Sequence, residues 1–566
     1  MSATSPTLVG RAAKRKFHRC KVHRKHTCWR ATTCPHRLHK KQNSQQSNQQ
    51  NQQNGNQQSG NQQSGNQQNG NQQNPPSNPP TTPVTPPQTP LPDLDGLHLG
   101  SRFSYGMTPT LTNEMAAAGG PSAWFEEQLS PAAIADPQAD GFQSWWLSID
   151  LDASTIWQRE KAEIEASWVA MSNYQRWLLL RRIYSKRQVL EQLTEFFENH
   201  LHVPTHDDGV FGFRSAYGKL IRQHALGRFD EMLVAAITHP AMGTSLDNAN
   251  STKRAPNENL GRELLELHTV GRGNYSEDDV KASARILTGF RVDMWTTWRD
   301  YYDPASHWTG PVQVMDFTHA NADPDGRAVA AAYLTYLARH PATAKRLMRK
   351  LAIRFVSDEP SAGLVDELTQ VYLANETRIV PVLRALVAHP EFAASVGSKV
   401  RTPTDDVVAT WRALDVTVDP PTVEGSAANT IVWQTTSVGA APHDWPRPDG
   451  QPERGSAWSS ASRVLASFEL HYSMSGTWWP KTGLTYHPLS SWVPITGNQS
   501  IRFDDLVDHV SRRLLCRPAS ARVQEAARLV TGLGAGTSIT LTHPLVKWDM
   551  PRLLTTLLDS PEHLTR

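Results

Sequence analysis

The feature that most constrains this chain is a helical repeat of apolar residues, which recurs from about Leu94 nearly to the carboxyl end. In residues 176–202, for example, Ile183, Leu190 and Phe197 fall near one face of a helix with 3.6 residues per turn. Amphipathic helices bury such faces against one another. The sequence therefore predicts an all-α fold, a globular body built from many helices.

Alternation typical of strands is scarce in this body. Thr430–Val432 and Ser538–Leu541 are the best short strand candidates. The section from Val418 to Val493 is rich in Gly, Pro, Ser and Trp, which indicates loops around a few helices. We expect residues 94–400 to form the helical core, and residues 401–566 to form a loop-rich and helical part of the same body.

The first 41 residues form a strongly basic arm. Twelve Lys and Arg lie between Arg11 and Lys41, and the first acidic residue of the chain is Asp93. Because the whole chain carries a formal charge of +3, removing the twelve charges of the arm leaves −9 for the rest. We expect the arm to be disordered and to bind a polyanion by counterion release. The acidic body gives no indication of binding nucleic acid.

Residues 42–93 form a linker of two compositions. The stretch 42–74 consists almost entirely of Gln, Asn, Ser and Gly, and 75–92 is dense in Pro and Thr. The first stretch has no apolar surface to offset the entropy of ordering, which predicts a flexible tether. The second predicts a stiffer, extended spacer.

The cysteines do not indicate a disulfide-built domain. Cys20, Cys28 and Cys34 lie in the arm among five histidines, and the fourth cysteine is Cys516. The arm cysteines are separated by seven and then five residues, spacings that match no common zinc-binding pair. A disordered arm is therefore favoured over a zinc module.

Two targeting features are missing from the sequence. No apolar run reaches the roughly eighteen residues of a transmembrane helix, and the basic amino terminus lacks the apolar centre of a signal peptide. We therefore expect no transmembrane segment and, by default, a cytoplasmic location.

The densest group of ionisable side chains lies in residues 257–271, which we expect to form one amphipathic helix with Asn257 as its N-cap. Glu258, Arg262 and Glu266 are spaced four residues apart, so the arginine can bridge both carboxylates. This spacing favours a buried arginine–carboxylate network that fixes helix packing.

That ladder leaves Glu263 and His268 without partners. Both can converge with His200 if two helices face each other, which is how helical bundles hold metal ions. The usual Glu-x-x-His spacing is absent, so a divalent metal is possible but not favoured. If the body is an enzyme, its catalytic candidates are His200, Arg262, Glu263, Glu266 and His268. Its metal-ligand candidates are His200, Glu263 and His268.

Two further binding interpretations stay open. Side-chain oxygens between Asp247 and Glu258 suit calcium, although Lys253 and Arg254 disfavour it and such residues commonly cap helices. Five tryptophans between Trp445 and Trp492 suit a glycan if they are exposed, and loop anchoring if they are buried.

Several motifs resemble, in order, those of the bacterial family called domain of unknown function 1800. They are residues 196–200 (FFENH), 239–242 (HPAM), 257–271, 287–290 (LTGF), 339–344 (RHPATA), 354–358 (RFVSD), 389–392 (HPEF) and 445–450 (WPRPDG). The resemblance covers about Leu97 to the carboxyl end and implies no particular activity, although many relatives look exported. His307 is followed by Trp308 where the family often has Asp, which leaves any role for His307 open.

Two functions of different class follow. The first is a binding or assembly protein of the cell envelope or surface, with the arm on a polyanion and the body on a protein or glycan partner. The alternative is a metal-dependent or acid–base enzyme with a pocket around residues 257–271. Whether the chain is an enzyme stays open on sequence alone.

Overall fold

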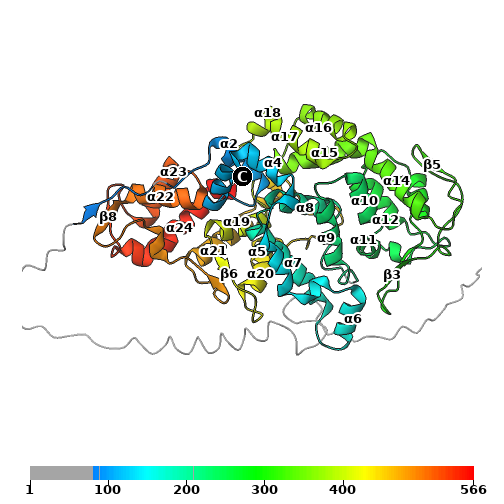
Figure 1. Ribbon diagram of the computed structural model, residues 1–566, viewed down its shortest axis with the longest axis horizontal. Helices are drawn as coiled ribbons and strands as arrows, with labels where there is room; N and C mark the ends of the chain where they lie inside the picture. The colour runs from blue at the N-terminus through cyan, green and yellow to red at the C-terminus, as the bar shows by residue number, and fades with distance from the viewer. Residues whose placement is uncertain (1–80, 88, 208) are drawn as a thin grey trace, which may run out of the picture. The chain divides into compact units, whose positions relative to one another are not determined.

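The computed structural model describes residues 81–87, 89–207 and 209–566. The predicted basic arm and most of the predicted linker therefore lie outside the described residues. In Figure 1 the described chain is mostly helical, with short strands at its edges. This confirms the prediction of an all-α fold.

The described residues contain twenty-four α-helices, which are listed here in chain order. The first twelve are α2 (Leu94–Phe103), α3 (Pro109–Ala118), α4 (Pro121–Gln128), α5 (Pro137–Gly141), α6 (Ala153–Lys161), α7 (Ser167–Tyr184), α8 (Gln188–His200), α9 (Arg214–His224), α10 (Phe229–Ile237), α11 (Pro240–Ser245), α12 (Glu258–Glu263) and α13 (Glu277–Ile286). The others are α14 (Arg327–Arg339), α15 (Pro341–Phe355), α16 (Ala362–Ala374), α17 (Ile379–Ala388), α18 (Pro390–Ala393), α19 (Pro403–Ala413), α20 (Ala427–Val438), α21 (Ala461–Ser475), α22 (Phe503–Leu515), α23 (Ala521–Thr531), α24 (Met550–Leu558) and α25 (Pro561–Leu564). No helix between residues 81 and 566 is both long and apolar enough to cross a membrane.

The strands are short and form four small sheets in the described part of the chain. They are β1 (Thr82–Pro83), β2 (Phe290–Val292), β3 (Asp300–Tyr302), β4 (Val312–Val314), β5 (Phe317–His319), β6 (Thr417–Val418), β7 (Leu484–Thr485), β8 (Gln499–Arg502) and β9 (Ser538–Ile539). β8 pairs in parallel with β1 and antiparallel with β9. Residues 82–83 of the predicted linker are thus hydrogen-bonded to the body.

Three local predictions meet different outcomes. The single helix expected over residues 176–202 is two helices, since α7 ends at Tyr184 and α8 begins at Gln188. Thr430–Val432 is not a strand but the middle of α20, where the longer helical context outweighs three β-branched residues. The strand expected at Ser538–Leu541 is present over its first two residues, as β9.

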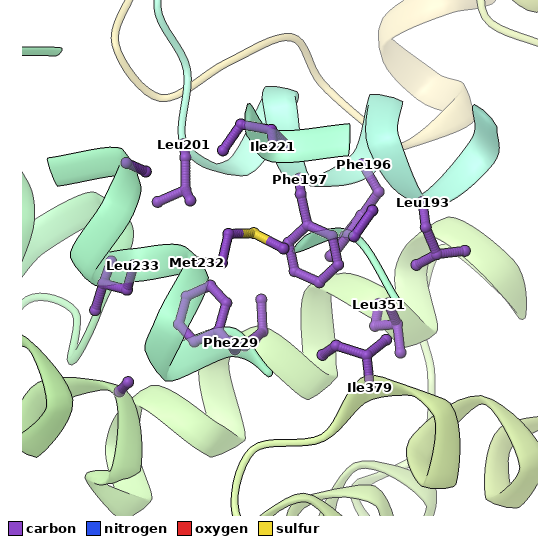
Figure 2. Packing of buried hydrophobic residues seen from close by; sticks show 14 of the residues in the cluster. Leu193, Phe196, Phe197, Leu201, Ile221, Phe229, Met232, Leu233, Leu351 and Ile379 are labelled. Carbon is purple, nitrogen blue, oxygen red and sulfur yellow. The ribbon is translucent and has the colours of Figure 1, made fainter. Parts of the chain in front are cut away.

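Two hydrophobic clusters form the interior of the body. The first is built mainly from α2 to α17, and the second from α7, the segment around α5, and α19 to α24. Figure 2 shows part of the first, where Phe197 of α8 lies among Phe229, Met232 and Leu351 from neighbouring elements. Helix α8 contributes to this core with one side only.

The two sides of α8 differ in chemistry although the whole helix is buried. At 3.6 residues per turn, Leu193, Phe196 and Phe197 share one side, and the carboxylates Glu191, Glu195 and Glu198 share the opposite side. Relative exposures of 2%, 2% and 0% place these three carboxylates out of reach of water. A buried charge is costly unless it is paired.

Each of these carboxylates is paired with arginine from another helix. Glu191 is 3.0 Å from Arg181 of α7 and 2.7 Å from Arg222 of α9. Glu195 is 3.1 Å from Arg182 of α7 and 2.8 Å from Arg354 of α15. Glu198 contacts Arg214 of α9 at 3.1 Å, Tyr174 at 2.6 Å and His443 at 2.8 Å. We call Glu191, Glu195 and Glu198 the α8 carboxylate ladder.

Arg354 extends the ladder to the second half of the body. Its guanidinium is 3.0 Å from Glu453 and 3.6 Å from Asp405 of α19. Arg354 is fully buried, so these contacts operate in a medium of low dielectric constant. One arginine therefore joins α8, α15, α19 and the loop that contains Glu453.

The ladder predicts a specific dependence of stability on pH. Burial by itself raises the pKa of Glu198, but His443 and Arg214 outweigh it and hold the pKa well below its ordinary value. The unfolded chain then binds one more proton than the folded chain below about pH 4.3, so the stability that Glu198 contributes is present above this pH and is lost as the pH falls.

We expect urea unfolding to show the free energy of unfolding falling below pH 4, and Glu198→Gln to reduce that slope by about 1.4 kcal/mol per pH unit. The matched control is Glu127→Gln, an exposed position on α4, which should leave the slope unchanged. An unchanged slope in Glu198→Gln would contradict this account.

Candidate functional site

A cavity of about 390 Å³ opens at the carboxyl end of α8. It is lined by Phe196, Asn199 and His200 from α8, by Lys350 and Ile353 from α15, and by residues of the loop 447–457. Phe196 and Ile353 supply apolar surface, and most of the other lining residues are polar or charged. A concave site on which polar groups converge is a typical place for a ligand. None of the side chains of residues 257–271 lines this cavity.

The loop is held on α8 by Asn199. The Asn199 side-chain amide donates to the Gln451 carbonyl at 2.9 Å and to Glu453 at 3.0 Å, and its oxygen accepts from the Gln451 backbone N–H at 2.8 Å. Gly450 makes this approach possible, because its φ is +75° and a Cβ there would lie 2.3 Å from the Asn199 carbonyl oxygen. The motifs at residues 196–200 and 445–450 therefore contact each other and together form part of the cavity wall.

The imidazole rings of His200 and His268 each form a hydrogen bond with the backbone carbonyl of the other residue. His268 Nδ1 is 2.9 Å from the His200 carbonyl, and His200 Nε2 is 3.1 Å from the His268 carbonyl. A carbonyl only accepts, so both of these ring nitrogens carry hydrogen. Burial lowers the pKa of His268 to about 4 and the pKa of His200 well below its ordinary value. Both rings are neutral at pH 7.

This tautomer leaves His200 Nδ1 as an acceptor that faces the cavity side chain Lys350. The Lys350 Nζ lies 3.3 Å from it and donates to it. Burial, together with the nearby Arg346, lowers the pKa of Lys350 to about 8. A fraction of the amines is therefore unprotonated near neutral pH, which an ordinary lysine does not achieve.

The segment 257–271 is not one α-helix. Asn257 is the N-cap as predicted, with its side chain accepting from the Asn259 N–H at 2.9 Å. After α12 the backbone widens into a π-helical turn, η5 (Leu264–His268). Such a turn is frequent at functional sites, and here it carries the ring of His268 towards His200.

The predicted arginine ladder of this segment is only half formed. Arg262 is 3.4 Å from Glu258, but its other partner is Glu277 at 2.7 Å and not Glu266. Glu266 instead binds Arg272 and accepts from Tyr275 at 3.1 Å. The side chain of Arg262 is 35% exposed, so the buried network expected here lies on α8.

The proposed ligand set of His200, Glu263 and His268 is not brought together in the described chain. The two histidines touch, but their ligand atoms and a carboxylate oxygen of Glu263 do not meet within metal-binding distance. Three of the four ring nitrogens are already occupied by two carbonyls and Lys350. Glu263 is half-buried, and burial with the nearby Glu266 raises its pKa.

Other sequence candidates have structural partners. His307 is buried between the Thr288 carbonyl at 3.0 Å and the Asn321 side chain at 3.0 Å. In the loop considered for calcium, Asn248 donates to the Leu287 carbonyl at 2.9 Å. Of the five tryptophans in the loop-rich section, Trp458 and Trp492 are buried, whereas Trp478 and Trp479 are 47% and 41% exposed.

Comparison with known proteins shows the family. The family described as "Protein of unknown function (DUF1800)" matches residues 98–565, which is most of the chain, so this chain belongs to that family. No curated protein and no solved structure matches the chain. The site must therefore be interpreted from its own chemistry.

Lys350 is the residue that sequence reasoning missed. It lies 150 positions from His200 in the chain, and its helix α15 has the ordinary pattern of an amphipathic surface helix. The only local sequence signal for this cavity is the motif at residues 196–200, which ends in His200. The pairing of α8 with α15 is a tertiary fact that the sequence alone does not reveal.

Proposed function

We propose that the body is an enzyme in which Lys350 acts as a general base or as an amine nucleophile on a small anionic carbonyl compound. As a nucleophile, the neutral amine adds to the carbonyl carbon and the adduct loses water to give an imine. The observation that carries the proposal is the Lys350 amine beside neutral His200 in a cavity of about 390 Å³. A lysine with a lowered pKa in a cleft is typical of such chemistry.

The surroundings of Lys350 support an anionic ligand. Arg447 and Arg454 stand at the exposed edge of the cavity, where they pair with Asp449 at 3.2 Å and Glu359 at 2.8 Å. Exposed pairs of this kind are weak, so an anionic ligand can compete for these arginines. Glu453 is bound by Arg354 at 3.0 Å. A carboxylate or phosphate on the ligand would pair with an arginine, and its carbonyl would then face Lys350. His200 holds the amine in place, and His268 fixes the tautomer that lets it do so.

The proposal predicts the reactivity of Lys350. Reductive trapping with pyruvate and cyanoborohydride, followed by peptide mapping, should label Lys350 with a pH midpoint near 8. Lys345 is the matched control on α15, because its side chain is 61% exposed and pairs with Asp366 at 2.8 Å. Lys345 should be labelled much less than Lys350 at pH 8.

Replacement separates the two lysines further. Lys350→Arg should abolish the labelling near pH 8, and Lys345→Arg should leave it unchanged. If Lys350 reacts no faster than Lys345 at pH 8, it is an ordinary lysine and the proposal fails.

A second proposal is a binding or assembly role at the cell envelope or surface. It is favoured by the uneven distribution of charge along the chain. Residues 11–41 carry twelve positive charges, whereas the net charge of the whole chain is only +3, so the body is acidic. The arm would bind an anionic polymer, and the body a protein or glycan partner.

Deletion of residues 1–80 tests this second role, because it removes the basic arm and keeps β1 on the body. Binding to a sulfated polysaccharide column should be lost on deletion and, in the full chain, should weaken steeply as salt rises. Equal retention of both proteins on the column would contradict it.

A further inference from the structure

A second group of buried polar side chains lies away from the Lys350 cavity. Asp406 of α19, His471 of α21 and His563 of α25 meet with relative exposures of 0%, 0% and 4%. One carboxylate oxygen and two imidazole nitrogens lie within 4.8 Å of one another. Among the described residues this is the one group with metal-ligand character.

The separations are those of ligands around one ion, although the shorter of the two is also a hydrogen-bond distance. Asp406 Oδ1 is 3.2 Å from His471 Nε2 and 3.7 Å from His563 Nε2. The second distance exceeds the range of an N–H···O hydrogen bond, which is about 2.7–3.2 Å. Two ligands about 2.0–2.1 Å from a tetrahedral zinc ion are roughly 3.3 Å apart, a value between the two observed distances.

The outer contacts orient the ligands as metal sites do. Asp559 lies 2.7 Å from His471 Nδ1, so His471 can donate outward through Nδ1. Nε2 lies on the side of the group, where a bound ion would replace its proton. Ser467 donates to the other oxygen of Asp406, Oδ2, at 2.6 Å, and Arg463 donates to it at 3.2 Å. Both donors thus leave Asp406 Oδ1 directed at the histidines.

A hydroxyl oxygen and further charged groups surround the three side chains. The Thr410 hydroxyl oxygen is 3.3 Å from His563 Nε2, which places an oxygen beside the group. Asp406 and Asp559 carry two negative charges, and Arg463, 3.2 Å from Asp406 Oδ2, offsets one of them. Arg463 also donates to the Arg401 carbonyl at 3.1 Å.

We propose that Asp406, His471 and His563 form a structural site for a divalent transition metal, of which zinc best suits two imidazoles and one carboxylate. The site is closed and buried, so the ion would cross-link α19, α21 and α25 rather than activate a substrate. It would stabilise the second hydrophobic cluster, whose helices surround it.

Metal content of the full chain tests the proposal. Protein purified with zinc and dialysed should retain one zinc more per chain than His563→Gln measured in the same way. His268→Gln is the matched control, because it removes a buried histidine outside the group. The difference between variants excludes zinc held by Cys20, Cys28 or Cys34, which all of these proteins contain.

A second measurement covers the case in which His563→Gln does not fold. Cobalt added to the chelator-treated wild-type protein should give the visible absorption of a tetrahedral nitrogen–oxygen site without the strong near-ultraviolet sulfur bands that the cysteines would produce. Chelator should also lower the midpoint of thermal unfolding. Equal zinc in the wild type and in a folded His563→Gln, or no visible cobalt spectrum together with no effect of chelator, would overturn the proposal. His471 would then be a proton-bearing imidazolium between Asp406 and Asp559.

Discussion

The α8 carboxylate ladder is the interaction on which the rest of the structure depends. Glu191, Glu195 and Glu198 are buried, and each would be strongly destabilising without its arginine partners. These partners come from α7, α9 and α15, so the helices can pack only in an arrangement that satisfies all three carboxylates. Arg354 also contacts Asp405 of α19, a helix of the second hydrophobic cluster. The pairing of buried charges therefore constrains how that cluster packs against α8.

The ladder also fixes the rotation of α8, and this positions the cavity. With the carboxylates turned to the arginines, the opposite side of the helix presents Phe196 and His200 to the first cluster and the cavity. Asn199 then holds the loop through Gln451, and His200 exchanges hydrogen bonds with His268. His200 and His268, which the sequence offered as catalytic candidates, thus have a structural role. They hold Lys350, which is the reactive group of the cavity.

Features that depend on local sequence could be predicted, and those that depend on distant pairing could not. The helical class and the N-cap at Asn257 are set within a few residues, and the structure has them. The division of residues 257–271 into α12 and a π-helical turn depends on packing, so the periodicity did not predict it. Lys350 and the group of Asp406, His471 and His563 join residues far apart in the chain. For the same reason the buried arginine–carboxylate network was expected on the wrong helix.

The most direct test of this account is a double-mutant cycle between Glu195 and Arg354, measured by urea unfolding at pH 7. The two side chains are 2.8 Å apart and fully enclosed. If the ladder organises the body, Glu195→Gln and Arg354→Met should show a coupling free energy of about 2–3 kcal/mol. A coupling below about 0.5 kcal/mol, the level found for independent sites, would contradict it.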